Sequence, residues 1–216
     1  MSEQRLGAAR VVICAVTAGL FLAGCAGQIF NKPPPKLYRL TPKSTFDTNM
    51  KKVNWQLTVE TPLAEAGINT SRIAVLRNPL SLDYYEGVTW VDTAPRLVQT
   101  LLVESFENSR KIVGVGRQSV NLRTDYALIT DLREFQSELV PKGNPVAHVR
   151  INAKLVRFPD RVIVATLSAD EKVPADGGKL PNVIQAFDKA LGRALKKIVV
   201  WGLTVVPSEN PRGRRR

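Results

Sequence analysis

The sequence predicts an α+β protein with a largely antiparallel mixed sheet and two helices packed on one face of it. Three features predict this class: a series of short strands, three long alternating strands, and two segments with helical spacing of apolar residues. Of the 216 residues, 44% are apolar and 23% are charged. These values are close to those of globular proteins, so the composition excludes a largely disordered chain.

Short strands are expected in the first part of the domain. Leu37–Leu40 and Trp55–Glu60 alternate between apolar and polar residues, and Arg72–Leu76 is a short apolar run. Pro79–Tyr85 adds an edge strand, after which Glu86-Gly87 turns the chain.

Two segments have the spacing of amphipathic helices. The first begins at Pro95, a residue that suits the first turn, and the second spans about Pro181–Trp201. Their apolar stripes consist of Leu97, Val98, Leu101, Leu102 and Phe106 in the first helix, and Val183, Phe187, Ala190, Leu191, Ala194 and Ile198 in the second. Lys196 and Lys197 are expected in the final turns of the second helix, where cations complement the helix dipole.

Three long strands are expected between the helices, over Asp125–Leu139, Pro145–Phe158 and Arg161–Lys172. The middle strand alternates for nine residues, which is typical of a strand with one buried and one solvated face. Its apolar face contains Ala147, Val149, Ile151, Ala153 and Leu155, and its polar face contains His148, Arg150, Asn152 and Lys154. Phe158–Arg161 fits a tight hairpin to the third strand.

Residues 1–24 have the features of a secretory signal peptide. Charged residues precede a twelve-residue apolar run, Val11–Leu22, and small residues follow it. Twelve residues form a helix of about 18 Å, well short of the roughly 30 Å hydrocarbon core of a membrane. The alternative is a buried N-terminal helix.

The residues Leu-Ala-Gly-Cys at 22–25 resemble the bacterial lipobox. The resemblance implies a diacylglycerol thioether on Cys25, cleavage by signal peptidase II between Gly24 and Cys25, and acylation of the new amino group, by palmitate for example. Two or three acyl chains hold a protein to a membrane effectively permanently. Because Ala26, and not an aspartate, follows the cysteine, the resemblance implies the periplasmic face of the outer membrane.

After the signal peptide, the sequence divides into three parts. Residues 25–36 form a lipidated spacer that contains Pro33–Pro35, a run that favours extended polyproline structure. The alternative is a proline ligand for another module. Residues 37–206 form a single α+β domain, and residues 207–216 form a basic tail that we expect to be disordered.

The sequence offers little for catalysis, cofactor binding or metal binding. Both cysteines lie in the first 25 residues, and His148 is the only histidine. The sequence contains neither a Gly-rich phosphate loop nor an HExxH pattern. In a regular strand Asp131 and Glu134 point to opposite faces, so they are not expected to share an acid–base site. We therefore expect a protein that is not an enzyme and that has no cofactor and no metal.

The chain carries a formal charge of +12. Its basic residues are spread over the expected strands and lack the clustered aromatic residues of nucleic-acid modules, so nucleic acid is not an expected partner. Two interpretations remain: a solvated positive surface, or attraction to an acidic partner such as anionic lipid head groups, lipopolysaccharide phosphates or an acidic protein face.

The segment Leu80–Trp90, followed by the helix that starts at Pro95, resembles the ABC-type transport auxiliary lipoprotein family. The other residues that carry the resemblance follow in order: Leu37–Leu40, Leu57–Glu60, Tyr126–Leu128 leading to Phe135, and the closing helix up to Trp201. The resemblance covers about Lys36 to Trp201. It rests on the spacing of tyrosine, tryptophan and glycine over many residues.

The resemblance implies an outer-membrane partner of a transporter built from an ABC ATPase, a permease and an MCE-domain protein, which moves lipids between the two membranes. The lipoprotein would dock the periplasmic MCE protein at the outer membrane, with a homo-oligomeric ring as one form of it. On this basis Tyr84, Tyr85 and Trp90 either contact a partner or wedge the turn before the first helix into the core.

Two other functions remain open. A periplasmic lipid carrier would hold an acyl chain between sheet and helices, in space left by Ala147, Ala153, Ala165 and Ala169. The same alanines also fit close packing of a helix on the sheet. The other alternative is a regulator of a cell-wall synthase.

Overall fold

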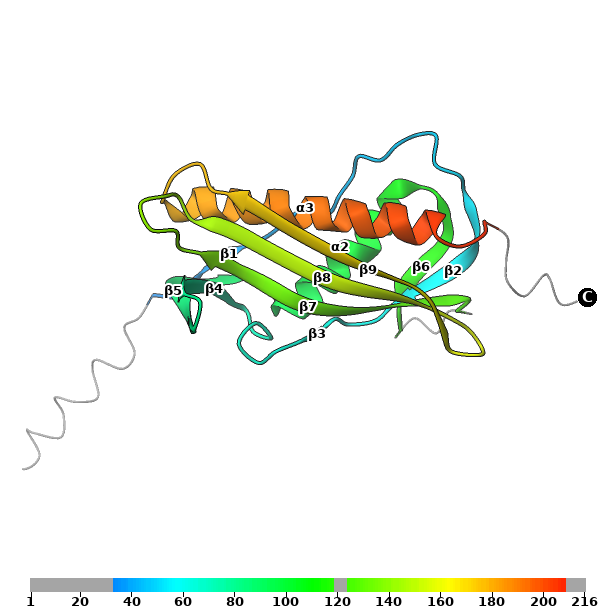
Figure 1. Cartoon of the computed structure of the whole chain (residues 1–216), viewed down its shortest axis with the longest axis horizontal. Coiled ribbons are helices and arrows are strands. Elements are labelled where there is room, and N and C mark those ends of the chain that lie inside the picture. Colours follow the sequence, from blue (N-terminus) through cyan, green and yellow to red (C-terminus); the bar gives the residue numbers. More distant parts are fainter. Residues whose placement is uncertain (1–32, 119–123, 209–216) are drawn as a thin grey trace, which may run out of the picture. The chain divides into compact units, whose positions relative to one another are not determined.

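A computed structural model describes residues 33–118 and 124–208 of the chain. The described residues form nine strands and two helices (Figure 1). In chain order these are β1 (Lys36–Tyr38), β2 (Val53–Val59), β3 (Leu63–Ala64), β4 (Arg72–Asn78), β5 (Ser81–Trp90), α2 (Ala94–Ser109), β6 (Ile112–Arg117), β7 (Tyr126–Glu138), β8 (Val146–Arg157), β9 (Val162–Pro174) and α3 (Leu180–Thr204). The predicted class is confirmed: the fold is α+β, with a mixed and mostly antiparallel open sheet and two helices.

The long strand β7 organises the sheet. On one side it pairs antiparallel with β8, which pairs antiparallel with β9. On its other side β7 pairs in parallel with three short strands in succession: β2 at residues 126–128, β3 at 131–132 and β4 at 136–138. The sheet therefore branches on this side, with β6 beyond β2 and with β5 and β1 beyond β4.

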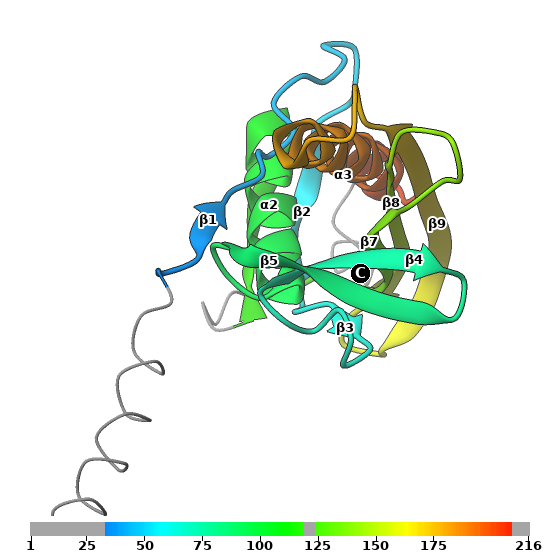
Figure 2. The same ribbon diagram turned by 90° about the vertical axis from the view of Figure 1, so that its left-hand side faces the viewer.

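Helix α3 packs against the inner face of β8 and β9 and lies next to α2 (Figure 2). The expected apolar face of β8 is this inner face, and each of its five residues is at most 1% exposed. Of the alanines that offered space for an acyl chain, Ala147, Ala153 and Ala169 are buried at the same level. Small side chains let a helix approach a sheet closely, so their burial favours close packing.

Strand β5 bends in its middle. Tyr84 pairs with Ala74 of β4, but the next pair with β4 joins Thr89 to Arg72, so β5 carries extra residues that bulge out of the ladder. Gly87 lies in this bulge with φ of 66°, a backbone conformation that side chains disfavour. Beyond it, residues 88–90 pair with β1. Glu86-Gly87 therefore bends a continuous strand and does not end one.

One hydrophobic cluster occupies the space between sheet and helices. Its largest aromatic group is formed by Trp90, Phe135 and Phe187, whose ring centroids lie 5.2 to 5.6 Å apart. Neither of the two helices in the described part of the chain is long and apolar enough to cross a membrane.

Candidate partner-binding surface

The hairpin of β4 and β5 projects an apolar residue into solvent. Leu80 lies in the two-residue connection between the strands and is 99% exposed. Its backbone N–H donates to the side-chain oxygen of Asn78 at 3.0 Å, which fixes the connection locally. Leu139 and Val140 are also exposed, at 39% and 45%. The N–H of Leu139 donates to the carbonyl of Leu76, so β4 joins these residues to the hairpin.

The side chains of Tyr84 and Tyr85 are half-buried. The hydroxyl of Tyr84 donates to the carbonyl of Gly67 at 3.0 Å, and the guanidinium carbon of Arg72 lies 3.6 Å from the centre of its ring. The hydroxyl of Tyr85 donates to the buried hydroxyl of Ser137 on β7 at 3.3 Å. Both hydroxyl groups are thus hydrogen-bonded within the fold, and the part of each ring that is not buried faces solvent.

An open depression of about 350 Å³ adjoins the two tyrosines. It is lined by Arg72, Val75, Arg77, Asp83, Tyr84, Tyr85, Glu86 and Leu139. Arg77 and Asp83 form an exposed ion pair of 2.7 Å within it. Aromatic and aliphatic surface surrounded by charged groups is typical of a protein-binding site. We call this depression together with Leu80 and Val140 the hairpin surface.

Trp90 does not belong to the hairpin surface. Its side chain is 1% exposed and packs on Phe135 of β7 and Phe187 of α3. Of the two interpretations of this residue, the structure favours the wedge into the core. Cys25 and Gly24, the expected lipidation and cleavage residues, lie outside the described residues, as does the tail from residue 209 onwards.

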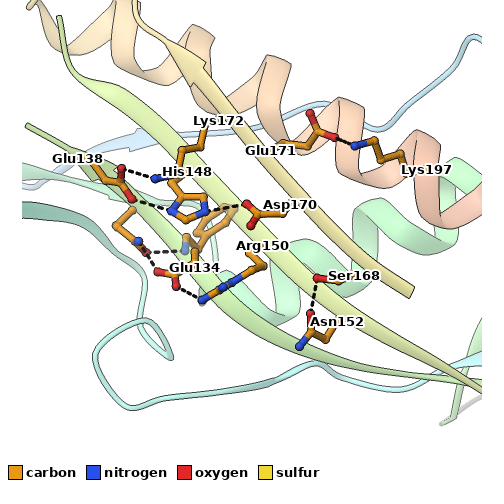
Figure 3. A network of polar contacts seen from close by, with 12 residues as sticks. Glu134, Glu138, His148, Arg150, Asn152, Ser168, Asp170, Glu171, Lys172 and Lys197 are labelled. Carbon is orange, nitrogen blue, oxygen red and sulfur yellow. Dashed lines mark hydrogen bonds and ion pairs between the residues drawn. The ribbon is translucent and has the colours of Figure 1, made fainter. Parts of the chain in front are cut away.

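The outer face of β7, β8 and β9 carries a network of polar contacts (Figure 3). At its centre His148 is 6% exposed, and its ring nitrogens lie 2.6 Å from a carboxylate oxygen of Glu138 and 2.8 Å from one of Asp170. Lys172 donates to the other oxygen of Glu138 at 2.8 Å. Both ring nitrogens of the histidine thus have partners, and its place is structural.

The surroundings of Glu138 change the pKa of its carboxyl. Burial is the largest single influence and raises the pKa, but hydrogen bonds from Lys172 and His148 and the attraction of their charges lower it more. The net result is a pKa below the ordinary value of 4.5. Glu138 therefore stays charged and holds this part of the network together.

A β-bulge overturns the expected placement of Asp131 and Glu134. The register of β7 against β8 shifts between Leu132 and Glu134, so both carboxylates lie on the outer face. Each one pairs with cations, however. Glu134 contacts Arg150, and Asp131 lies 3.9 Å from the ammonium of Lys154. The bulge was not visible in the sequence because neither a glycine nor a proline marks it.

The described residues contain no group of three histidine, cysteine, aspartate or glutamate side chains that could hold a metal ion. The hairpin surface combines aliphatic and aromatic surface with charged groups. Its exposed leucine and its depression were not recognised as a unit in the sequence, because Leu139 reaches β4 only through the parallel pairing with β7.

Comparisons with known proteins give a family and a fold. A family model described as an ABC-type transport auxiliary lipoprotein component matches residues 38–199. An uncharacterized protein of Bradyrhizobium diazoefficiens is 29% identical over 160 residues, which are 72% of this chain and 41% of that protein. The chain thus spans about two fifths of the length of this curated relative.

Two solved structures share the fold. A crystal structure of a protein from Xanthomonas campestris is 32% identical and has a TM-score of 0.75, covering 79% of this chain and 95% of that one. A second, of an uncharacterized protein, has a TM-score of 0.61 at 11% identity and covers 77% and 97% of the two chains. The second likeness concerns the fold alone.

Proposed function

The chain belongs to the family of ABC-type transport auxiliary lipoprotein components, and on this basis we propose that it docks the periplasmic MCE-domain protein of an ABC lipid transporter at the outer membrane. The resemblance that the sequence carried over Lys36–Trp201 is confirmed by this match. The docking partner, the lipid cargo and the outer-membrane location are the proposed part. A ring of several copies belongs to the same proposal.

The proposed anchor is Cys25, acylated after cleavage behind Gly24. The spacer at residues 25–36 would connect it to the domain, whose first strand begins at Lys36. A lipoprotein held in this way needs no helix that crosses the membrane, and its affinity for the membrane comes from its acyl chains.

The single observation that carries the docking role is the hairpin surface. Exposed apolar surface formed by several side chains marks interaction sites. Leu80 is fully exposed at the tip of this hairpin, and the depression on the same hairpin adds Leu139 and the ring surface of Tyr84 and Tyr85. We propose that the two tyrosines bind the partner through their exposed surface, whereas Trp90 supports β5 from within the core.

The test is recovery of partners from gently solubilised envelopes after crosslinking in the cell. The wild-type protein is expected to recover an MCE-domain protein together with its permease. Leu80→Asp places a charge on a side chain that the fold does not use, so we expect strongly reduced recovery at unchanged protein level. Val113→Asp is the matched control, because Val113 is exposed apolar surface on β6.

A Cys25→Ser variant serves as the mislocalised control and is expected to recover neither component. Recovery of cell-wall synthases in place of the MCE protein would favour a regulator and contradict the docking role. Equal recovery by Leu80→Asp and the wild type would remove the hairpin surface from the proposal.

A further inference from the structure

A groove runs between α3 and the edge strand β9, away from the residues of the hairpin surface. It has a volume of about 610 Å³. Its eight lining residues are Leu167, Glu171, Arg193, Lys196, Lys197, Val200, Trp201 and Thr204. Strand β9 pairs with β8 alone, so no further described strand covers this side.

The floor of the groove is apolar. Leu167 of β9 and Val200 and Trp201 of α3 are half-buried and supply most of it. The one carboxylate, Glu171, is on the inner face of β9 with 10% of its side chain exposed, and it is paired with Lys197 (Figure 3). The ion pair therefore neutralises the only acidic group of the groove.

The rim of the groove is basic. Arg193, Lys196 and Lys197 are exposed. Lys196 and Lys197 lie three and four residues after Arg193 on α3, so the three cations share one side of the helix with Val200. The expected dipole role of these lysines is not confirmed, because α3 continues to Thr204 and its last turn contains no basic residue. With Lys197 paired, two cations remain beside the apolar floor.

We propose that this groove binds a single anionic phospholipid, with an acyl chain on the floor and the phosphate at Arg193 and Lys196. Apolar lining with a few convergent charged groups and a volume of 300–1,000 Å³ is typical of small-ligand sites. A protein partner of ordinary interface size would need about 20–30 residues on each side, and only eight line the groove. Lysine and arginine beside an apolar surface hold the charged ends of their side chains in water, where these ends attract anionic head groups.

Trp201 makes the proposal testable at one residue. The chain has three tryptophans, and Trp55 and Trp90 are each 1% exposed in the core. Only Trp201 lies in the groove, where an acyl chain would touch its ring. Bromine atoms on an acyl chain quench the fluorescence of a tryptophan only at contact, so quenching reports occupancy of the floor.

The experiment uses the full chain with Cys25→Ser, which carries no lipid anchor of its own, and vesicles of phosphatidylglycerol or phosphatidylcholine with brominated chains. We expect saturable quenching with phosphatidylglycerol, at least tenfold weaker quenching with phosphatidylcholine, and no quenching in a Trp201→Phe variant. Equal quenching by both lipids, or none, would overturn the proposal. A change in Trp201 emission with an acidic amphipathic peptide but not with lipid would assign the groove to a protein and overturn it too.

Two substitutions separate the groove from adsorption to a charged membrane. Lys196→Glu is expected to weaken phosphatidylglycerol binding about tenfold, since the change removes one of the two cations proposed to hold the phosphate and adds an anion. Lys189→Glu, on an exposed part of α3 outside the groove, makes the same charge change and is expected to leave binding within about twofold.

Leu167→Asp places a charge on the floor and is expected to abolish quenching, with far-ultraviolet circular dichroism as the check of folding. If both lysine variants bound equally, or if Leu167→Asp were quenched like its parent, the lipid would lie on the surface and not in the groove. The measurement needs no transporter component, so it tests lipid binding in the groove independently of the proposed docking role.

Discussion

Trp90 provides the sharpest test of how the fold is held together. Its side chain is 1% exposed and forms two of the three contacts in the aromatic cluster, with ring centroids 5.6 Å from Phe135 and 5.2 Å from Phe187. Replacing a buried tryptophan with alanine loses its transfer free energy and leaves a cavity, at a cost of about 3–5 kcal/mol. The lost ring–ring contacts add to this, so we expect Trp90→Ala near the upper end of that range.

Trp90→Phe is the informative companion. The indole N–H of Trp90 is buried and has no hydrogen-bond partner among the described residues. Phenylalanine removes this polar group, whose burial costs about 1–3 kcal/mol, while it keeps an aromatic ring in the cluster. Removal of this penalty offsets much of the stability that is lost with the smaller side chain. We therefore expect the free energy of unfolding to fall by about 1 kcal/mol or less.

The free energy of unfolding is measured by equilibrium urea denaturation followed by circular dichroism, and partner recovery is measured in the same variants. Trp90→Phe is expected to recover partners like the wild type. If the free energy of unfolding of Trp90→Ala lay within about 1 kcal/mol of the wild-type value, the assignment of this residue to the core would be wrong. The same conclusion would follow if Trp90→Phe folded normally but lost its partners.

Three further outcomes are expected. Glu138→Gln is expected to lower the free energy of unfolding at neutral pH. In urea titrations this difference from wild type disappears as pH falls from 4.5 through the lowered pKa of folded Glu138, because its carboxylate stabilises the fold only while it is charged. A difference that stayed constant down to low pH would contradict this reasoning. Gly87→Ala costs about 1–2 kcal/mol in the same assay, since φ is 66° there, although nothing lies within 4 Å of an added Cβ; a neutral effect would show that the bend relaxes. Lys197→Met costs about 1–3 kcal/mol by leaving the carboxylate of Glu171 unpaired, and Glu171→Gln in the same chain recovers most of it; without that recovery the ion pair is not the cause.

The strands β7, β8 and β9 and both helices were predicted to within a few residues. The apolar residues repeat at helical spacing over ten or more residues in both helices, and the side chains of β8 alternate over nine. Periodicity of such length is a strong signal. The two-residue strand β3 was missed because two residues carry no period.

The parallel pairings of β2, β3 and β4 with β7 were also not predicted. They depend on contacts between segments far apart in the chain, which local patterns do not encode. The family resemblance was readable from spaced aromatic residues, but the hairpin surface and the groove were not. Both arise where segments distant in sequence meet, as Leu139 meets β4 and Leu167 meets α3.

The pairing at the end of β5 affects how the fold carries mechanical load. Residues 88–90 keep β4 on one side, where Thr89 pairs with Arg72, and have β1 as a parallel neighbour on the other, where Trp90 pairs with Tyr38. Tension applied along the chain upstream of Lys36 is therefore transmitted to β1 and shared among its hydrogen bonds to β5. The last of these bonds joins the N–H of Val91 to the carbonyl of Tyr38 at 3.0 Å, directly beside the tryptophan that is wedged between Phe135 and Phe187. A pull on the chain before β1 would thus be borne beside the buried aromatic group of the core.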